Sequence, residues 1–407
     1  MARTATKKRL SFTHRRPRRT PQQTPHSDAA SRPAVGGRVD TPFLLLTILL
    51  TVMGLVMLFS ASFPSANYET GDPAFYLKRQ GIFALLGLAA MVVMSRLNYQ
   101  RLRGFAKILL YLSVFLLALV LVPHVGITEN GATRWLGKQG VLTFQPSEIA
   151  KLAIIVYFAD SISKKKNLMG TFRYGIRPYI LILAVFAGLM LLEPHLSGTI
   201  LIVGTGVVLM MVGGIDKRWV IGGVGAVAVV GFSYVKLVEA GVISYGADRI
   251  NMWKDPFIDA LGDGYQLCQS LIAIGSGGLT GVGLGKSRQK FLYMPEEHND
   301  FIFAVVCEEL GLIGAVLVML VFALLILRGF WIALQARDRF GALLVVGIMT
   351  QIGLQTFLNI SVVTGFMPTT GISLPFFSYG GTALALQLFE MGIVLGVSRQ
   401  IPAPRGG

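Results

Sequence analysis

The chain has 407 residues, of which 53% are hydrophobic and only 14% are charged, and its mean hydropathy is +0.62. Soluble domains carry about 25% charged residues, so this composition excludes a disordered chain, a coiled coil and a small disulfide-stapled secreted domain. Two cysteines cannot form a disulfide framework, and the five histidines lack the spacing of a zinc site. The net charge is +16, and half of this excess lies before residue 43.

Residues 1–42 form a basic segment without an apolar face. They contain ten Lys and Arg residues against two aspartates and are rich in Pro and Thr. This composition predicts a disordered tail. A basic segment can bind nucleic acid, but one that adjoins a membrane span more often marks its cytoplasmic side, so we expect no nucleic-acid partner.

Apolar windows of about 20 residues, the length that spans a bilayer, recur between residues 43 and 400. They predict an all-α polytopic integral membrane protein with about ten transmembrane helices. The expected spans are residues 43–62, 81–95, 105–122, 148–162, 178–193, 198–215, 218–236, 301–327, 340–362 and 378–397.

The basic residues give an independent prediction of sidedness. If the tail is cytoplasmic, the segments on that side contain 26 of the 37 Lys and Arg residues. This bias predicts two cytoplasmic termini and an even number of spans. The chain is thus divided into the tail at 1–42, a membrane domain at 43–400 and a cytoplasmic C-terminal end at 401–407.

The longest loops are predicted on the extracytoplasmic side. Residues 63–80, 123–147 and 237–300 form them, and the last, between spans seven and eight, far exceeds the length that a connection needs. Its aromatic and aliphatic residues argue against disorder. Its glycine-rich part, 275–285, favours a re-entrant turn over a phosphate-binding loop, because no Walker spacing or strand–loop–helix context surrounds it.

Ionisable residues inside predicted spans are costly, so each is a functional candidate. Glu148 and Lys151 lie three residues apart at the start of span four and are expected to pair with each other. Glu193 precedes Pro194, which should break the helix and could open a wet cavity. The others are Glu308, Glu309 and Glu390.

The densest polar cluster is residues 294–300, which ends at Asp300 directly before the apolar start of span eight. Asp300 is predicted either to be the N-cap of that helix or to be an acid of a site at the outer membrane surface. The preceding Lys286, Arg288 and Lys290 supply positive charge. A carboxylate beside cations suits a pyrophosphate-bearing lipid substrate, and it would also suit plain headgroup anchoring.

Several long motifs resemble the SEDS family of shape, elongation, division and sporulation proteins. They are Gly264-Tyr265-Gln266, Gln269 to Gly278, Ser287-Arg288-Gln289-Lys290, Pro295-Glu296, Asp300-Phe301-Ile302-Phe303-Ala304, Glu308-Glu309-Leu310-Gly311, Asn130 to Leu136, Phe144 to Glu148, and Asn359 to Gly381. The resemblance covers residues 43–400, and the family's fold has ten spans. The basic tail and the motif Pro375-Phe376-Phe377-Ser378 look more like the division and sporulation branch than the elongation branch.

This resemblance implies a glycosyltransferase that polymerises lipid II into peptidoglycan glycan strands together with a class B penicillin-binding transpeptidase and other division proteins. Its location would be the bacterial cytoplasmic membrane at the septum, with the active face extracytoplasmic. The family's catalytic aspartate falls on Asp300, and the pair Arg134-Trp135 matches positions implicated in substrate handling. Gln266 and Glu297 lie in or beside matching motifs and are further candidates for substrate binding.

One carboxylate is sufficient for this chemistry. The polyprenyl diphosphate leaves without needing a general acid, so only the acceptor hydroxyl must be deprotonated, and a single inverting displacement gives the β1,4 linkage. We expect Asp300 to be the general base and Arg134, Lys286, Arg288 and Lys290 to stabilise the diphosphate charge.

One departure from the family concerns His195, which stands where the family usually has an acid. A role there that needs a second carboxylate, such as holding a divalent cation (Mg²⁺ or Mn²⁺), would fall to Glu193; no other cofactor is expected. Two other functions stay open. A lipid II flippase could use Glu148, Glu193, Glu309 and Glu390 along a lateral path, and a non-catalytic scaffold would only recruit the transpeptidase.

Overall fold

The computed structural model describes residues 37–129, 132–138, 142–165, 168–240, 252–262, 264–291, 294 and 297–401. Most of the predicted tail therefore lies outside the described residues, as do parts of the loop at 237–300 and most of the C-terminal end.

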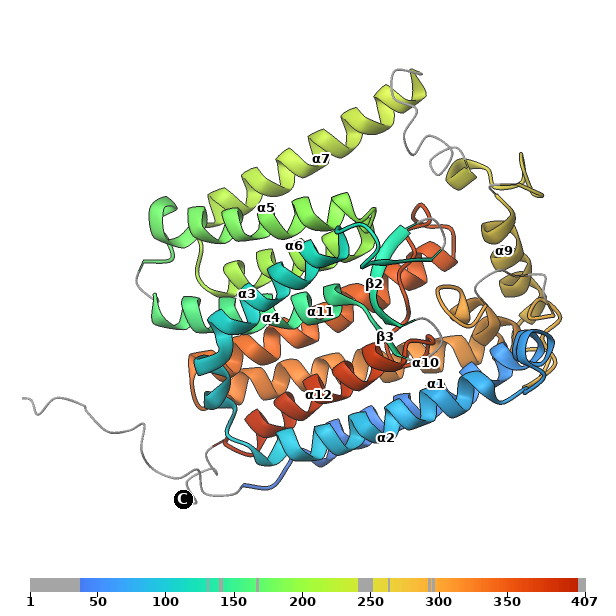
Figure 1. Cartoon of the computed structure of the whole chain (residues 1–407), viewed down its shortest axis with the longest axis horizontal. Coiled ribbons are helices and arrows are strands. Elements are labelled where there is room, and N and C mark those ends of the chain that lie inside the picture. The colour runs from blue at the N-terminus through green and yellow to red at the C-terminus, as the bar shows by residue number, and fades with distance from the viewer. Residues whose placement is uncertain are drawn as a thin grey trace, which may run out of the picture. The chain divides into compact units, whose positions relative to one another are not determined.

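The described residues fold mainly into long helices that lie side by side (Figure 1). The helices are α1 (Thr41–Thr70), α2 (Phe75–Arg96), α3 (Leu102–Val120), α4 (Pro146–Lys164), α5 (Arg177–Leu192), α6 (Leu196–Val212), α7 (Lys217–Glu239), α9 (Tyr265–Gly277), α10 (Ile302–Gln335), α11 (Arg339–Val363) and α12 (Gly381–Ser398).

Each predicted span coincides with one of these helices. Among the described residues, seven helices are long and apolar enough to cross a membrane, counting η1 (Tyr99–Arg101) with α3 and the π-helix η2 (Phe172–Ile176) with α5, and α6 is a shorter apolar helix. The chain is therefore a multi-pass membrane protein. The exact number of crossings stays a prediction.

The helix ends depart from the prediction in three places. Helix α1 continues to Thr70, so the first outer loop is much shorter than residues 63–80. Helix α10 continues to Gln335, and it contains a break at Gly311, where φ is +66°. The break between α5 and α6 falls at Glu193 and Pro194, as the proline predicts.

The folded part of the chain begins before the predicted boundary at residue 43. Asp40 is the N-cap of α1, and its carboxylate accepts a hydrogen bond from the Phe43 amide at 3.0 Å. The same carboxylate forms an ion pair with Arg328 of α10 at 2.7 Å. The Gly37 amide donates to the Arg399 carbonyl at 3.2 Å. These bonds join residues 37–42 to the ends of α10 and α12.

The second outer loop adds a small β-sheet to the predicted helical membrane fold. Strands β1 (Ile127–Glu129), β2 (Ala132–Lys138) and β3 (Leu142–Phe144) form an antiparallel sheet in the order β1-β2-β3. Thr128 pairs with Thr133, and Leu136 pairs with Phe144. A loop outside a helix must satisfy its backbone groups by other means, and this segment does so through a hairpin ladder of β-branched and aromatic residues.

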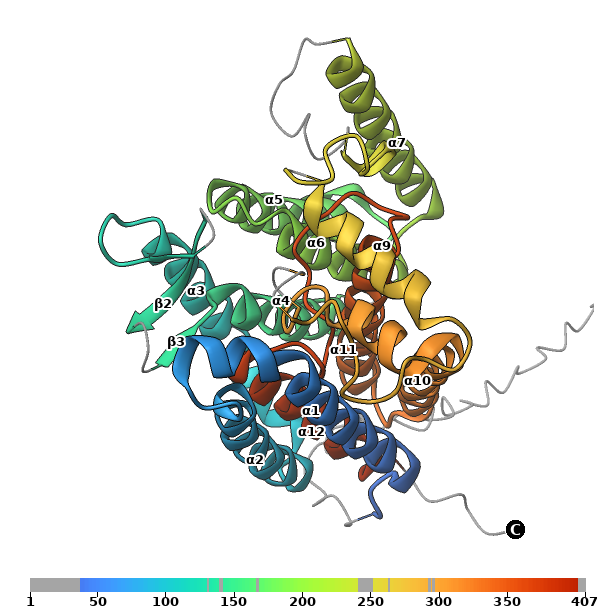
Figure 2. The same cartoon turned by 90° about the vertical axis from the view of Figure 1, so that its right-hand side faces the viewer.

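The glycine-rich segment packs directly on the first turns of α10. The amides of Val282 and Gly283 donate to the carbonyls of Glu308 and Glu309, each at 3.0 Å. A Cβ on Gly281 would lie 2.1 Å from the Glu309 carbonyl oxygen, so only glycine allows this approach. The glycine-rich segment is therefore joined to α10 by backbone hydrogen bonds. Figure 2 views this end of the bundle, where the sheet and α9 lie.

Candidate functional site

A cavity of about 700 Å³ opens at the end of the bundle that carries the sheet. Its walls come from α2, the sheet, the start of α4, the corner between α5 and α6, the segment before α10, α11 and the segment before α12. Three of its lining residues are cationic and three are acidic: Arg79, Arg134 and Lys151, and Glu69, Glu148 and Asp300. The cavity thus has the size and polarity of a site for a charged ligand.

Asp300 lines this cavity and is only partly buried. It is not the N-cap of α10, because that position is occupied by Phe301. The N-cap interpretation of Asp300 is therefore wrong. Asp300 belongs to a loop whose backbone carbonyls are bound to neighbouring elements, and it lines the cavity from that loop.

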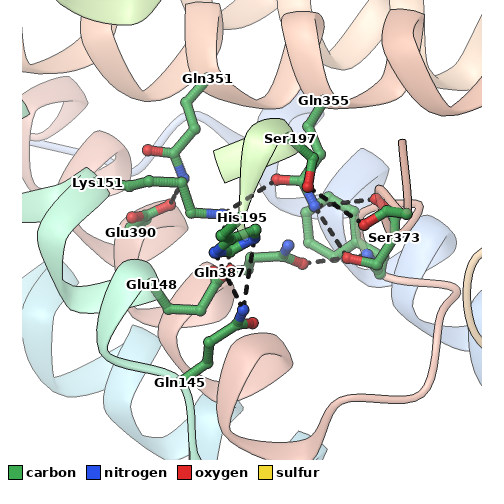
Figure 3. Close-up of polar contacts among 12 residues, drawn as sticks. Gln145, Glu148, Lys151, His195, Ser197, Gln351, Gln355, Ser373, Gln387 and Glu390 are labelled. Carbon is green, nitrogen blue, oxygen red and sulfur yellow. Dashed lines mark hydrogen bonds and ion pairs between the residues drawn. The ribbon is translucent and has the colours of Figure 1, made fainter. Parts of the chain in front are cut away.

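Glu148 and Lys151 also line the cavity, and their predicted pairing is confirmed. The Lys151 ammonium lies 2.8 Å from Glu148 Oε1, with only 3% of the Lys151 side chain exposed. It also donates to Gln355 Oε1 of α11 at 3.4 Å (Figure 3). The sequence analysis did not predict a place for Lys151 in a ligand cavity. The sequence signal for it is that Lys151 lies in the first turns of a span that follows a long outer loop.

His195 forms the wall at the corner between α5 and α6. Both ring nitrogens lie 3.5 Å from the Gln145 amide nitrogen, as Figure 3 shows. Burial, and secondarily the positive charges of Arg134 and Lys151, lowers the pKa of His195 to about 3. The imidazole is therefore neutral, so this corner of the cavity carries no charge from His195.

Arg134 joins the sheet to this corner. Its Nε donates to the Glu193 carbonyl at 3.4 Å, and its Nη2 donates to the Pro194 carbonyl. Its neighbour Trp135 also lines the cavity. The structure thus places both members of the predicted Arg134-Trp135 pair in the same cavity as Asp300.

The segment that contains the three predicted diphosphate-binding cations, residues 286–290, does not line this cavity. None of Lys286, Arg288 and Lys290 lines it. The Lys290 ammonium is buried and paired with Glu309, whereas Lys286 and Arg288 are exposed. The structure therefore corrects the predicted grouping of these three cations with Asp300. The reason is that the segment of these cations is bound to α10, through Ser287 and the Arg288 amide to Glu308 and through Lys290 to Glu309.

Gln266 and Glu297 are also absent from the cavity lining. Gln266 lies in the first turn of α9. Glu297 is buried, with one carboxylate oxygen 3.6 Å from His298 Nδ1, so it lies behind a residue that does line the cavity. Their predicted role in substrate binding stays a prediction.

The predicted cation ligand, Glu193, does not belong to a cluster of three or more metal-ligating side chains in the described part of the chain. Glu193 is buried, and its backbone carbonyl accepts a hydrogen bond from Arg134, which brings a positive charge to this corner. Among the described residues no three His, Cys, Asp or Glu side chains converge on one point. Mg²⁺ commonly binds one or two protein carboxylates together with substrate phosphates, so a cation held jointly with a diphosphate ligand stays a prediction.

The four glutamates of the flippase hypothesis do not share a path. Only Glu148 lines the cavity. Glu309 is bound to Lys290, and Glu390 is buried in α12, where it accepts a hydrogen bond from Gln351 at 3.3 Å (Figure 3). The structure therefore gives no support to a continuous acidic route through these residues.

Comparison with known proteins agrees with this architecture. The chain is 40% identical over 364 residues to a probable peptidoglycan glycosyltransferase FtsW of Geobacter metallireducens, covering 89% of this chain and 96% of the relative. It is 42% identical over 360 residues to the stage V sporulation protein E of Bacillus subtilis, covering 88% and 97%.

Two solved structures are similar in fold. The rod shape determining protein RodA of Thermus thermophilus matches with a TM-score of 0.66 and 30% identity, covering 90% of this chain and 98% of that protein. A chain from a peptidoglycan synthase complex matches with a TM-score of 0.73 and 31% identity, covering 89% and 98%. A family model for cell cycle proteins of the FtsW, RodA and SpoVE type matches residues 40–402. The chain therefore belongs to the FtsW/RodA/SpoVE family of cell cycle proteins.

Proposed function

We propose that this protein is a peptidoglycan glycosyltransferase that polymerises lipid II into β1,4-linked glycan strands. The observation that carries the proposal is that Asp300 shares one cavity with Arg79, Arg134 and Lys151. A glycosyl donor that leaves as a diphosphate needs positive charge at the leaving group and one base at the acceptor. The cavity contains groups of both kinds.

Asp300 is the proposed general base. It takes the proton from the 4-hydroxyl of the acceptor sugar as that oxygen attacks the anomeric carbon of the donor, and the bond to the diphosphate breaks. Attack from the opposite face inverts the α-linked donor to a β-linkage in a single step. A positioned base contributes roughly 10²–10⁴-fold to such a rate.

The three cavity cations are proposed to stabilise the departing diphosphate. They come from α2, the sheet and α4, so they surround the ligand space instead of following one another along the chain. Charge-assisted hydrogen bonds to phosphate oxygens are roughly twice as strong as neutral ones. Removal of water by the lipid substrate would strengthen them further.

The same proposal assigns the partner and the location. The solved chain from a peptidoglycan synthase complex supports a class B penicillin-binding transpeptidase as the partner, with other division proteins nearby. The cavity would face the extracytoplasmic side of the bacterial cytoplasmic membrane. We infer a role at the division septum from the relatives named FtsW, and a sporulation role is the alternative that the stage V relative supports.

Purified protein with labelled lipid II tests this proposal. Asp300→Asn should bind lipid II and fold normally but lose polymerisation, because an amide cannot accept the proton. Asp255→Asn, which neutralises an exposed carboxylate outside the cavity, is the matched control and should polymerise like the wild type. Glycan products from Asp300→Asn at the wild-type rate would contradict the catalytic assignment. If the protein were instead a flippase or a scaffold, Asp300→Asn should leave its activity largely unchanged.

A further inference from the structure

We propose that Asn359 is a positioning residue that fixes Asp300 for proton abstraction. The inference rests on the proposed function and adds to it a residue that does not line the cavity. Asn359 lies in α11 and is fully buried. Its amide nitrogen donates one hydrogen bond to the Asp300 carbonyl at 2.7 Å and a second to the Ile372 carbonyl at 2.6 Å.

The second bond matters because of where the Ile372 segment lies. Gly371 has φ +68°, and a Cβ placed on it would lie 3.3 Å from Asp300 Oδ2. A side chain at position 371 would therefore contact the carboxylate of Asp300. One amide group thus holds both the backbone of Asp300 and the loop beside its carboxylate.

Two further bonds hold the residues just before Asp300. The Tyr379 amide donates to the His298 carbonyl at 2.8 Å, and the Ser378 hydroxyl donates to the Asn299 carbonyl at 2.6 Å. Three consecutive carbonyls, from His298 to Asp300, are therefore bound to α11 or to the segment before α12. Asn359 supplies the bond at Asp300 itself.

An asparagine suits this task because its NH₂ group has two donors on one atom. Its Oδ1 is buried and has no hydrogen-bond partner among the described residues. The two N–H bonds are therefore the hydrogen bonds that this side chain makes to the described residues. The geometry fits a group that must present two N–H bonds to two loops.

The Asn359 bonds would affect catalysis by fixing the position of the Asp300 carboxylate. A general base must lie within hydrogen-bond reach of the proton that it abstracts. A displacement of about 1 Å can lower a rate by about 10²-fold. Loss of the Asn359 bonds should therefore reduce turnover while leaving the cations that bind lipid II in place.

The experiment compares Asn359→Asp and Gly371→Ala with Thr356→Val in purified protein. Asn359→Asp keeps the shape but turns an acceptor toward two carbonyls, and Gly371→Ala places a methyl group against the carboxylate at positive φ. Thr356 is buried in the same helix, its hydroxyl has no hydrogen-bond partner among the described residues, and valine matches its shape, so it is the control. The readouts are kcat and KM for labelled lipid II, with the melting temperature recorded for each variant.

We expect kcat to fall by about 10²-fold in both test variants, with KM within about threefold of the wild type and with Thr356→Val unchanged. A general structural role would instead lower the melting temperature and leave kcat per folded molecule intact, which would overturn the inference. If Asn359→Asp does not fold, the kcat of Gly371→Ala is the deciding measurement. A wild-type kcat for Gly371→Ala also overturns the inference. Polymerisation by Asp300→Asn would refute the proposed function itself, whereas an inactive Asp300→Asn beside fully active Asn359→Asp refutes only the positioning role.

Discussion

The ammonium of Lys290 lies 2.9 Å from Glu309 Oε1, and only 3% and 0% of the two side chains are exposed. Ser60 of α1 donates to the same carboxylate at 2.7 Å, so the pair joins the loop before Asp300 to α1 and α10. Removing one member of a buried pair leaves an uncompensated charge that costs about 3–5 kcal/mol. We therefore expect Lys290→Met to lower the melting temperature in detergent.

The double variant Lys290→Met with Glu309→Gln provides the control for this prediction. Removing both charges should restore most of the melting temperature, because no buried charge remains unpaired. A raised KM for lipid II with an unchanged melting temperature would instead return Lys290 to the substrate-binding role that the sequence suggested.

Lys151 is expected to bind the diphosphate, so its loss should weaken lipid II affinity. Lys151→Met removes a charge-assisted contact of about 1.5–3 kcal/mol, which corresponds to roughly a 10-fold or greater rise in KM. Because it also leaves the Glu148 carboxylate without its partner, KM is determined on folded protein whose melting temperature is recorded. Lys164→Met makes the same change at the opposite end of α4, where the side chain is 61% exposed, and should leave KM unchanged. Equal KM values for the two variants would exclude Lys151 from the ligand site.

His195 should make folding stability depend on pH. Its pKa is about 3 in the folded protein, because of burial, and 6.5 is its ordinary value. The unfolded chain therefore binds more protons between these values, so stability is lost as the pH falls below about 6.5. His195→Gln cannot take up this proton, and its melting temperature should fall less than that of the wild type between pH 7.5 and pH 5. Parallel pH profiles for the two proteins would contradict the neutral, buried state of this imidazole.

The sidedness of the chain can be tested by labelling intact cells with an impermeant maleimide. Lys286→Cys replaces an exposed residue of the loop predicted outside, and Gly170→Cys replaces an exposed residue predicted inside with open space around it. We expect labelling of the first without lysis and of the second only after lysis. The two native cysteines are buried and serve as the background control. Labelling of Gly170→Cys from outside would reverse the topology.

The sequence by itself predicted the position of every long helix and the break at Pro194. Those features depend on local properties: apolar length, the restriction that proline places on the backbone, and the spacing of Glu148 and Lys151 on one helix face. It also predicted a site at Asp300 and paired Arg134 with Trp135, because these residues lie in long motifs.

Only the tertiary structure decided which charges share a cavity. Lys290 lies ten residues from Asp300 in the sequence but is bound to Glu309, whereas Lys151, about 150 residues away, lines the cavity with it. The choice of partner depends on how α4, α10 and α11 pack, and a buried charge takes whichever opposite charge the packing brings near. The role of Asn359 is of the same kind, since its two bonds join loops that meet only in the folded bundle.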